Sequence, residues 1–335
     1  MALPITVPLP YGGEALSSFN PSDSSVVDSA GVFNGTYSTQ CIAINPGSTA
    51  STPAWNVANP FWMHWVAGMG LPYNAVGDSI VAQFYQGSVE VARVTCNDLG
   101  NYTVGTFKLW TLQGASLVAI GATANAPLNL PLVLNTFDVG LTAGSSGVAT
   151  FCIGGTVQFQ ATGLNHASWS GVTNVVLCGG MGATFNPGVS WSQVIFNNTP
   201  TVGYFLYHKR LNTNSAVNTG WTGSVTNINE IPTSDASPLI AATPGLVSTF
   251  SQNGLSLTGN ITALLVCARF RVQGAGPPNN RLTTRVAGAN YPGPPLTANV
   301  GFLGSGNSWT TNPATGLPWT AVAISGTEDG TTSST

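Results

Sequence analysis

Residues whose side chains could act as acids, bases or nucleophiles are scarce in this sequence. Its 335 residues include three histidines and 11 aspartates and glutamates together. The chain contains no GxSxG nucleophile elbow, no HExxH zinc motif, no P-loop and no EF-hand pattern. Because no acid–base pair or nucleophile is recognisable, we expect a protein that is not an enzyme and that binds no cofactor and no metal ion.

His64 and Asp138 stand inside apolar stretches. In Phe61-Trp-Met-His-Trp65, strand alternation places Trp62 and His64 on one face. Two interpretations stay open for His64: an exposed aromatic ledge that packs against a sugar ring, or a core strand whose imidazole is hydrogen-bonded. Asp138, once buried, needs hydrogen-bond partners or a cation. No cluster of Asp and Asn surrounds it in the sequence, which argues against a calcium site.

The five cysteines are scattered through the chain, at Cys41, Cys96, Cys152, Cys178 and Cys267. None belongs to a CxxC motif or to a Cys/His cluster with the spacing of a metal site. All but Cys41 lie in or beside apolar runs, and free cysteine is among the most buried residue types. We therefore expect reduced, packed thiols, while one disulfide stays open if the protein meets oxidising surroundings.

Charge is the most unusual feature of the composition. Charged residues make up 6% of the chain, with 8 Lys and Arg against 11 Asp and Glu and a net charge of -3, whereas about 25% is usual. This balance argues against binding to nucleic acid or to anionic lipid. No apolar run is long enough to span a membrane, so we expect no membrane insertion. So few charges protect a solitary chain poorly against association, and we expect partners that include copies of this chain.

Half of the positive charges lie close together near the C-terminal end, at Arg269, Arg271, Arg281 and Arg285. Arg269 and Arg271 share one face of an expected strand. They would form a small basic stripe that contacts acidic groups of a neighbouring subunit. The alternative is a solvated edge strand that its charges protect against aggregation, and the sequence favours neither.

Apolar residues alternate over short segments that Gly, Pro, Asn and Ser interrupt, as in all-β sandwiches and barrels. Gly154-Gly155 predicts a two-residue hairpin turn, because glycine adopts the positive φ angles of such turns. After this turn we expect Val157, Phe159 and Ala161 to face the core. The expected strands are residues 79–85, 88–95, 105–111, 131–142, 148–153, 156–162, 172–178 and 190–196.

Turn-rich and polar stretches divide the chain into an ordered series of parts. We expect an N-terminal segment that is a docking arm or the first strands, a sandwich, a surface connection, a second β domain and a frayed tail. The second domain contains the strongest apolar strand, Ile261–Val272. The expected ranges are 1–54 for the N-terminal segment, 55–205 for the sandwich, 206–238 for the connection, 239–330 for the second domain and 331–335 for the tail.

Several stretches resemble, in order, the minor structural or tail-fibre-type proteins of tailed bacteriophages built around a concanavalin A-like (laminin G-like) jelly roll. The resemblance covers most of residues 55–330, whereas the first 54 residues match no motif. This chain has Gly154-Gly155 where the family usually has Asn-Gly. Relatives tend to be richer in Asp directly after the Glu-x-Pro motif, where this chain has Asp235. The motifs are Phe61-Trp-Met-His-Trp65, Thr136-Phe-Asp-Val-Gly140, Val189-Ser-Trp-Ser-Gln-Val-Ile195, Asn227-Ile-Asn-Glu-Ile-Pro232, Val266-Cys-Ala-Arg-Phe-Arg271 and Asn312-Pro-Ala-Thr-Gly-Leu-Pro-Trp-Thr320.

The resemblance implies an all-β fold: a concanavalin A-like jelly-roll sandwich followed by a second, smaller β-sandwich domain. It implies a non-enzymatic component of a phage virion, such as a tail fibre, spike, tail-tip or decoration subunit, which is made in the host cytoplasm. Its partners would be copies of itself and other virion proteins. The alternative is a carbohydrate-binding module or a glycan-acting enzyme of jelly-roll type, although the chain shows no pair of clustered carboxylates for glycoside hydrolysis.

A glycan on the host surface is the ligand that the jelly-roll resemblance makes plausible. Aromatic and amide side chains in loops grip sugars through ring faces and hydrogen bonds, and four such residues lie in turn-rich segments. We expect Tyr73, Asn74, Tyr102 and Trp169 to be exposed and to make these contacts. The alternative is that these residues pack against neighbouring subunits or against their own sandwich.

Overall fold

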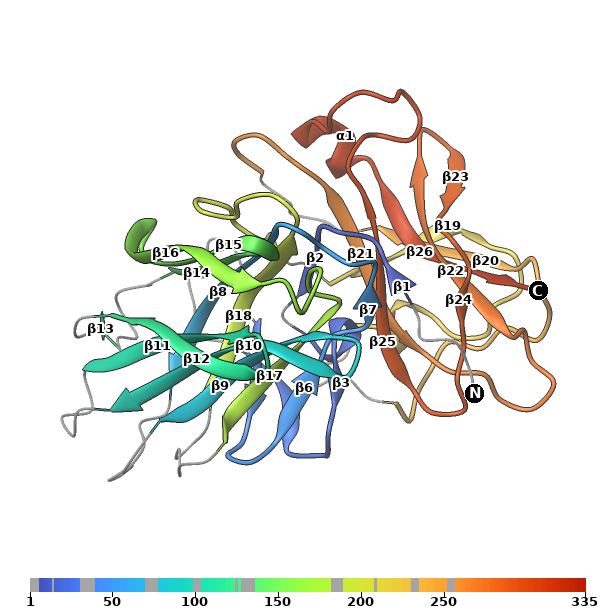
Figure 1. The fold of residues 1–335 in the computed structure, drawn as a ribbon. Coiled ribbons are helices and arrows are strands. Elements are labelled where there is room, and N and C mark those ends of the chain that lie inside the picture. Colours follow the sequence, from blue (N-terminus) through green and yellow to red (C-terminus); the bar gives the residue numbers. More distant parts are fainter. Residues whose placement is uncertain are drawn as a thin grey trace.

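The computed structural model describes residues 6–13, 15–30, 40–69, 78–98, 104–123, 126–127, 136–181, 189–207, 210–229, 235–251 and 257–335. Strands dominate this part of the chain (Figure 1). Its helical segments are the short helix α1 (Ala321–Ser325) and the 3-10 turns η1 (Leu16–Ser18) and η2 (Val225–Asn227). The expected fold class is confirmed: a jelly-roll sandwich is followed by a smaller β domain.

Two antiparallel sheets form the sandwich. The first has the order β12-β11-β10-β9-β17-β6-β3, with β13 (Ala126–Pro127) beside β11. Its other strands are β12 (Ser116–Ala122), β11 (Val104–Gln113), β10 (Val89–Asp98), β9 (Ser79–Gln86), β17 (Asn174–Met181), β6 (Thr49–Ser51) and β3 (Asn20–Pro21).

The second sheet has the order β16-β15-β14-β8-β18-β5-β4, with β2 (Tyr11–Gly13) beside β18. Its sequence-adjacent strands β14, β15 and β16 form a meander. The strands are β16 (Thr156–His166), β15 (Gly144–Ile153), β14 (Thr136–Thr142), β8 (Phe61–Met69), β18 (Val189–Asn197), β5 (Gln40–Ile44) and β4 (Val26–Ala30).

The described N-terminal strands extend both sheets of the sandwich. β3 and β6 extend the first sheet, whereas β2, β4 and β5 extend the second. In addition, β1 (Thr6–Val7) pairs in parallel with β7 (Ala54–Trp55). Of the two interpretations of residues 1–54, the described residues therefore match the one in which they form the first strands.

Aromatic side chains fill the space between the two sheets. Trp65 stacks on Phe137 with ring centroids 5.3 Å apart, and Phe107 of the first sheet lies 5.0 Å from Phe137 of the second. Trp65 and Trp191 are among the largest fully buried side chains. Each such residue removes a large apolar area from water, worth about 25 cal/mol per Å². The described core of the sandwich is therefore one continuous apolar cluster.

The C-terminal domain, which we define as residues 210–335, contains a six-stranded and a two-stranded sheet. The first has the order β19-β20-β26-β22-β23, with β24 beside β22, and the second pairs β21 with β25. The strands are β19 (Thr213–Asn218), β20 (Val247–Ser251), β26 (Glu328–Ser334), β22 (Asn279–Val286), β23 (Ala289–Pro292), β24 (Leu296–Thr297), β21 (Leu264–Phe270) and β25 (Leu303–Trp309).

The expectation of a frayed C-terminal tail is wrong. Strand β26 pairs with β20 on one side and with β22 on the other, so it is a central strand of the sheet. Two of its buried hydroxyls are hydrogen-bonded: that of Ser333 donates to Thr243 O at 2.8 Å, and that of Thr331 donates to Asn280. Pairing on both sides offsets the polar composition that suggested disorder.

The segment expected to be a surface connection, 206–238, is partly regular. It contains β19, which pairs with β20, and the capped turn η2. The C-terminal domain therefore begins before residue 239. In Figure 1, β21 and β25 lie between the six-stranded sheet and the sandwich.

Candidate functional site

A cavity of about 310 Å³ lies in the C-terminal domain. β21 from Val266 onward and its extension to Gln273 form one wall, and residues of β20, β22 and β26 form another. Residues from the described segments 210–228 and 235–241 also line it, and Ala15 and Ser17, at η1, touch its edge. Its lining includes Ala15, Arg210, Trp221, Asp235, Leu239, Phe250, Val266, Cys267, Arg269, Phe270, Arg271, Gln273, Asn280, Leu282, Phe302 and Thr331.

The inner surface of the cavity is mainly apolar. Phe250, Val266 and Leu282 are buried side chains that line it, and Leu282 packs in one cluster with Val266. Trp221 is held in place because its indole N–H donates to Leu246 O at 2.9 Å. An apolar interior of this kind gives water few hydrogen-bond partners.

Four charged side chains line the cavity, and three of them are in ion pairs. Arg210 contacts Asp28 of β4 at 2.9 Å, and Arg269 contacts Asp235 at 2.9 Å. Arg271 is exposed and has no carboxylate partner among the described residues. Its guanidinium lies 4.8 Å from the centre of the Phe302 ring and donates to Gln273 Oε1 at 3.3 Å. Arg271 therefore gives the cavity a net positive charge.

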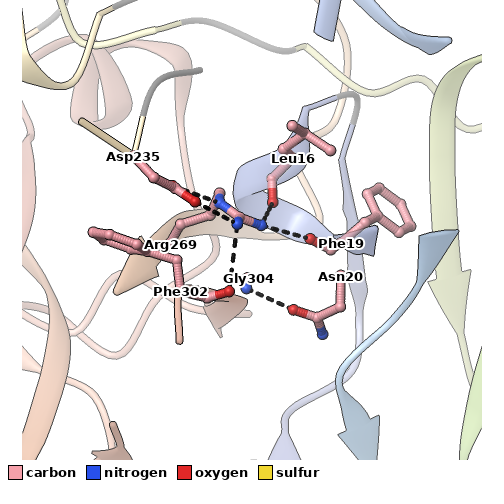
Figure 2. Close-up of polar contacts among 7 residues, drawn as sticks. All are labelled: Leu16, Phe19, Asn20, Asp235, Arg269, Phe302 and Gly304. Atoms are coloured by element: carbon pink, nitrogen blue, oxygen red, sulfur yellow. Dashed lines mark hydrogen bonds and ion pairs between the residues drawn. The ribbon is translucent and has the colours of Figure 1, made fainter. Parts of the chain in front are cut away.

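The Arg269 guanidinium joins the cavity wall to the sandwich, as Figure 2 shows. It forms two hydrogen bonds with the Asp235 carboxylate, at 3.1 and 2.9 Å. It also donates to Leu16 O and Phe19 O at 3.4 Å and to Phe302 O at 3.3 Å. One planar, always charged group thus satisfies carbonyls from both halves of the molecule.

Close backbone approach strengthens the same junction. A Cβ atom on Gly304 would lie 2.8 Å from the backbone nitrogen of Phe19, and one on Gly306 would lie 2.6 Å from the Tyr11 ring. The N–H of Gly304 donates to Asn20 Oδ1 at 2.8 Å. Glycine at these two positions of β25 lets the N-terminal strands pack directly on the C-terminal domain.

Cys267 lines the cavity but is not a nucleophile. Burial raises the pKa of its thiol to about 12, so the thiol stays protonated at neutral pH. Its Sγ lies 3.7 Å from Gly12 O.

His64 and Asp138 meet on the face of β8 and β14 that points away from the aromatic core. Nδ1 of His64 lies 2.9 Å from Oδ1 of Asp138, and the Thr201 hydroxyl donates to the same oxygen at 2.8 Å. All three side chains are fully buried. His64 Nε2 and Asp138 Oδ2 have no partner in this structure. The ledge interpretation of His64 is therefore wrong, because a fully buried ring cannot contact a sugar.

Cys152 is the neighbour of Asp138 across β14 and β15. Burial, aided by the nearby Asp138 carboxylate, raises the pKa of its thiol to about 11. This Cys, His and Asp grouping therefore supplies no thiolate at neutral pH, and it is closed to substrates.

Of the expected glycan contacts, three lie outside the described residues: Tyr73, Asn74 and Tyr102. The fourth, Trp169, is only 5% exposed, so the expectation that it is exposed is wrong. Its indole N–H donates to Leu112 O at 3.1 Å, and its ring packs on His166. The turn that carries Trp169 folds back onto the sandwich, which sequence pattern alone does not reveal.

The basic stripe differs from its expectation. The Arg269 side chain is 9% exposed and pairs with Asp235 of its own chain, so it is not free to contact a neighbouring subunit. Arg271 follows the end of β21 and is exposed. A subunit contact through Arg271 stays a prediction.

The described residues contain no group of three or more His, Cys, Asp or Glu side chains placed to hold a metal ion. In the same part of the chain, no helix is long and apolar enough to cross a membrane. All five cysteines are free thiols.

Sequence reasoning missed the cavity altogether. Its walls come from segments that lie far apart in the sequence, from Arg210 to Ser333, and its apolar side chains have the same pattern as a filled core. The clustering of arginines near residue 270 was the one signal that pointed to this region.

No family model matches the sequence, and no curated protein matches it either. Among solved structures, the chain is similar to the receptor-binding domain of botulinum neurotoxin type G, with 10% identity and a TM-score of 0.37, over 56% of this chain and 43% of that one. It is also similar to the metal-free carbohydrate recognition domain of Emp46p (8% identity, TM-score 0.37, 55% of this chain and 90% of that one). A third is the alginate lyase Aly36B (9% identity, TM-score 0.38, 61% and 100%). This chain thus spans less than half of the neurotoxin chain, and at these values no ligand or activity follows from the likeness.

Proposed function

We propose that this chain is a non-catalytic structural subunit that associates with further copies through the open edges of its sandwich. The observation that carries the proposal is the pair of edge strands β12 and β16, which end the two sheets on the same side of the molecule. Both are long, and neither contains a charged residue or a proline. Val118 of β12 is 42% exposed and Val157 of β16 is 55% exposed.

Proteins normally protect a sheet edge with charge, proline or short length. Three other edge strands of this molecule follow that rule. β3 has two residues and ends in Pro21, β23 has four residues and ends in Pro292, and β4 carries Asp28. Among the described residues, no strand pairs with the outer side of β12 or β16, and neither strand has charge, proline or short length, although each has a β-bulge against its inner neighbour. Another strand can therefore add to the stretches outside the bulges.

The distribution of charge supports the same proposal. Of the seven Lys and Arg residues that the structure describes, five are in ion pairs within the chain, so few charges are left to keep copies apart. The pairs are Arg93 with Glu90, Lys108 with Asp78, Arg210 with Asp28, Arg269 with Asp235 and Arg285 with Glu328.

Within this proposal, we infer that the assembly is the virion of a tailed bacteriophage, where the chain is a tail-fibre, spike, tail-tip or decoration subunit. The ordered motifs of the sequence support this placement. Electron microscopy of particles labelled with an antibody to this chain tests it. Labelled particles support the placement, and particles that carry none of the chain contradict it.

Association is tested with the double variant Val118→Lys, Val157→Lys, which places one charge on each open edge. We expect the parent protein to form larger species with rising concentration in sedimentation velocity, and the variant to stay monomeric. Val300→Lys is the control, because Val300 is 86% exposed and lies outside both edges. A parent protein that stays monomeric at every concentration contradicts the proposal.

Glycan recognition is a second candidate function. The pairing of β9, β10 and β11 favours this function. Ser79, near the start of β9, pairs with Cys96 of β10, and Asp98, at the end of β10, pairs with Gly105 of β11. The segments that contain Tyr73, Asn74 and Tyr102 therefore start or end at neighbouring positions of one sheet. Binding of the parent protein to purified host-surface glycans, weakened in Tyr73→Ala and Tyr102→Ala, supports this role. Release of reducing ends from those glycans would instead reveal a glycan-acting enzyme.

A further inference from the structure

We propose that the cavity of the C-terminal domain binds an alkyl carboxylate, with the alkyl chain inside the cavity and the carboxylate on Arg271. This site is independent of the association proposed for the sandwich edges. Two features of the cavity carry the inference: an apolar interior, and one cation at its rim whose charge no carboxylate of the described chain balances.

The interior fits an alkyl chain. Phe250, Val266 and Leu282 line the cavity with carbon atoms from three different strands. The volume of about 310 Å³ is at the lower end of the range of roughly 300–1,000 Å³ of small-molecule sites, so a chain of medium length is expected. A polar ligand would lose its hydrogen bonds to water without replacement in these surroundings.

The rim fits a carboxylate. Arg271 presents a planar fork of donors, which matches the two oxygens of a carboxylate. The guanidinium carbon of Arg271 lies 4.8 Å from the centre of the Phe302 ring. Its Nη2 donates to Gln273 Oε1 at 3.3 Å, and its other N–H groups are left for the carboxylate of a ligand. The other arginines of the cavity differ, since Arg210 and Arg269 already hold Asp28 and Asp235.

The amides of the cavity argue against a sugar as its ligand. Asn280 Oδ1 accepts a hydrogen bond from Thr331, and Asn227 Nδ2 donates to Ser237 O at 3.1 Å. Asn279 Nδ2 donates to Thr335 O at 2.7 Å. These groups are occupied by the protein itself, whereas a sugar needs several free donors and acceptors.

The test is calorimetric titration of the full chain with decanoate, octanoate, hexanoate and acetate. Saturable binding with one site per chain is expected for decanoate. Affinity should rise about fourfold for each added CH₂ group, which corresponds to about 0.8 kcal/mol of apolar burial. Acetate should not bind measurably. No saturable binding of decanoate, or equal binding of acetate and decanoate, overturns the proposal.

The carboxylate contact is tested with Arg271→Gln, a change at an exposed position that should leave the fold intact. Decanoate should bind about tenfold more weakly to this variant, while decanol, which has no charge, should bind equally to both proteins. Arg93→Gln, on the sandwich, is the matched control and should bind decanoate like the parent. Equal binding of decanoate to the parent and to Arg271→Gln contradicts the role of Arg271.

Discussion

The sandwich and the C-terminal domain differ in how completely their interiors are packed. In the sandwich, aromatic rings from both sheets form one apolar cluster, with Phe61 and Phe84 of opposing sheets in edge contact at 5.8 Å. The C-terminal domain has two small clusters, around Trp319 and around Leu282, and a cavity beside the second. The sandwich therefore has a filled core and two edge strands without protection by charge or proline, whereas the C-terminal domain has a cavity in its interior.

This difference shows where each region has unpartnered groups. In the part of the chain that the structure describes, no strand pairs with the outer edges of β12 and β16, which is why we assign association to the sandwich. The C-terminal domain leaves apolar surface free in its interior, which is why we assign a ligand to it. The strands of this domain are also joined by side-chain hydrogen bonds, such as the one between the hydroxyls of Thr283 and Thr332 across β22 and β26, at 2.7 Å.

The largest expected effect comes from emptying the sandwich core. Trp191→Ala removes a fully buried ring that lies 5.9 Å from Trp65, and it should lower the free energy of unfolding by about 3–5 kcal/mol. Trp221→Ala, in the half-buried cover of the cavity, should cost less than half as much. Urea unfolding measures both. Equal losses for the two variants would mean that the two regions are packed alike.

The next effect is the pH dependence of the C-terminal domain. Burial raises the pKa of the Asp329 carboxyl from its ordinary 3.8 to about 6. Between these values the folded chain holds a proton that the unfolded chain has released, so a rise in pH favours unfolding. The stabilisation is complete below pH 3.8 and is lost as the pH passes 6, a difference on the order of 3 kcal/mol.

Asp329→Asn isolates this contribution, because asparagine does not titrate. The difference in unfolding free energy between the parent and this variant should change between pH 4 and 7, with the parent losing stability relative to the variant. A difference that is constant over this range contradicts the assignment to Asp329.

A smaller effect is expected at the junction between the regions. Arg269→Met keeps much of the side-chain volume but removes the donors to Asp235 and to the carbonyls of Leu16, Phe19 and Phe302. We expect a loss of about 2 kcal/mol, which is typical for hydrogen bonds of a charged group. The C-terminal domain should then unfold before the sandwich in calorimetry. A single transition at the parent temperature would show that the junction does not depend on Arg269.

The smallest effect on stability belongs to the edge variant Val118→Lys, Val157→Lys. Both side chains are exposed, so the free energy of unfolding of the dilute protein should change by no more than about 0.5 kcal/mol. Thermal unfolding at low concentration measures it. A loss of several kcal/mol would mean that these residues support the fold, and their effect on association could not then be assigned to the edge.

Local patterns predicted the sandwich well, because its strands alternate and its turns use recognisable residues. Gly154 and Gly155 have φ angles of 57° and 76°, as the expected hairpin turn requires. Alternation failed at Val157, which was expected to face the core with Phe159. Phe151 pairs with Phe159, but Cys152 pairs with Val157, because β16 has a bulge at this point. Val157 and Phe159 are two residues apart and yet face opposite sides of the sheet.

Long-range pairing decided the features that sequence pattern could not predict. The polar strand β26 is central because β20 and β22 pair with it, and neither lies next to it in the sequence. His64 and Asp138 each stood out, but their contact depends on the register of β8 against β14. The cavity likewise depends on how segments from several strands are spaced.

Hydrogen exchange followed by mass spectrometry at increasing protein concentration tests the central claim most directly. Peptides from β12 and β16 should exchange more slowly as concentration rises, because strand addition covers their free amides, while peptides from β23 should be unaffected. Exchange in β12 and β16 that does not depend on concentration, in a protein shown by sedimentation to associate, would contradict the account and place the interface elsewhere.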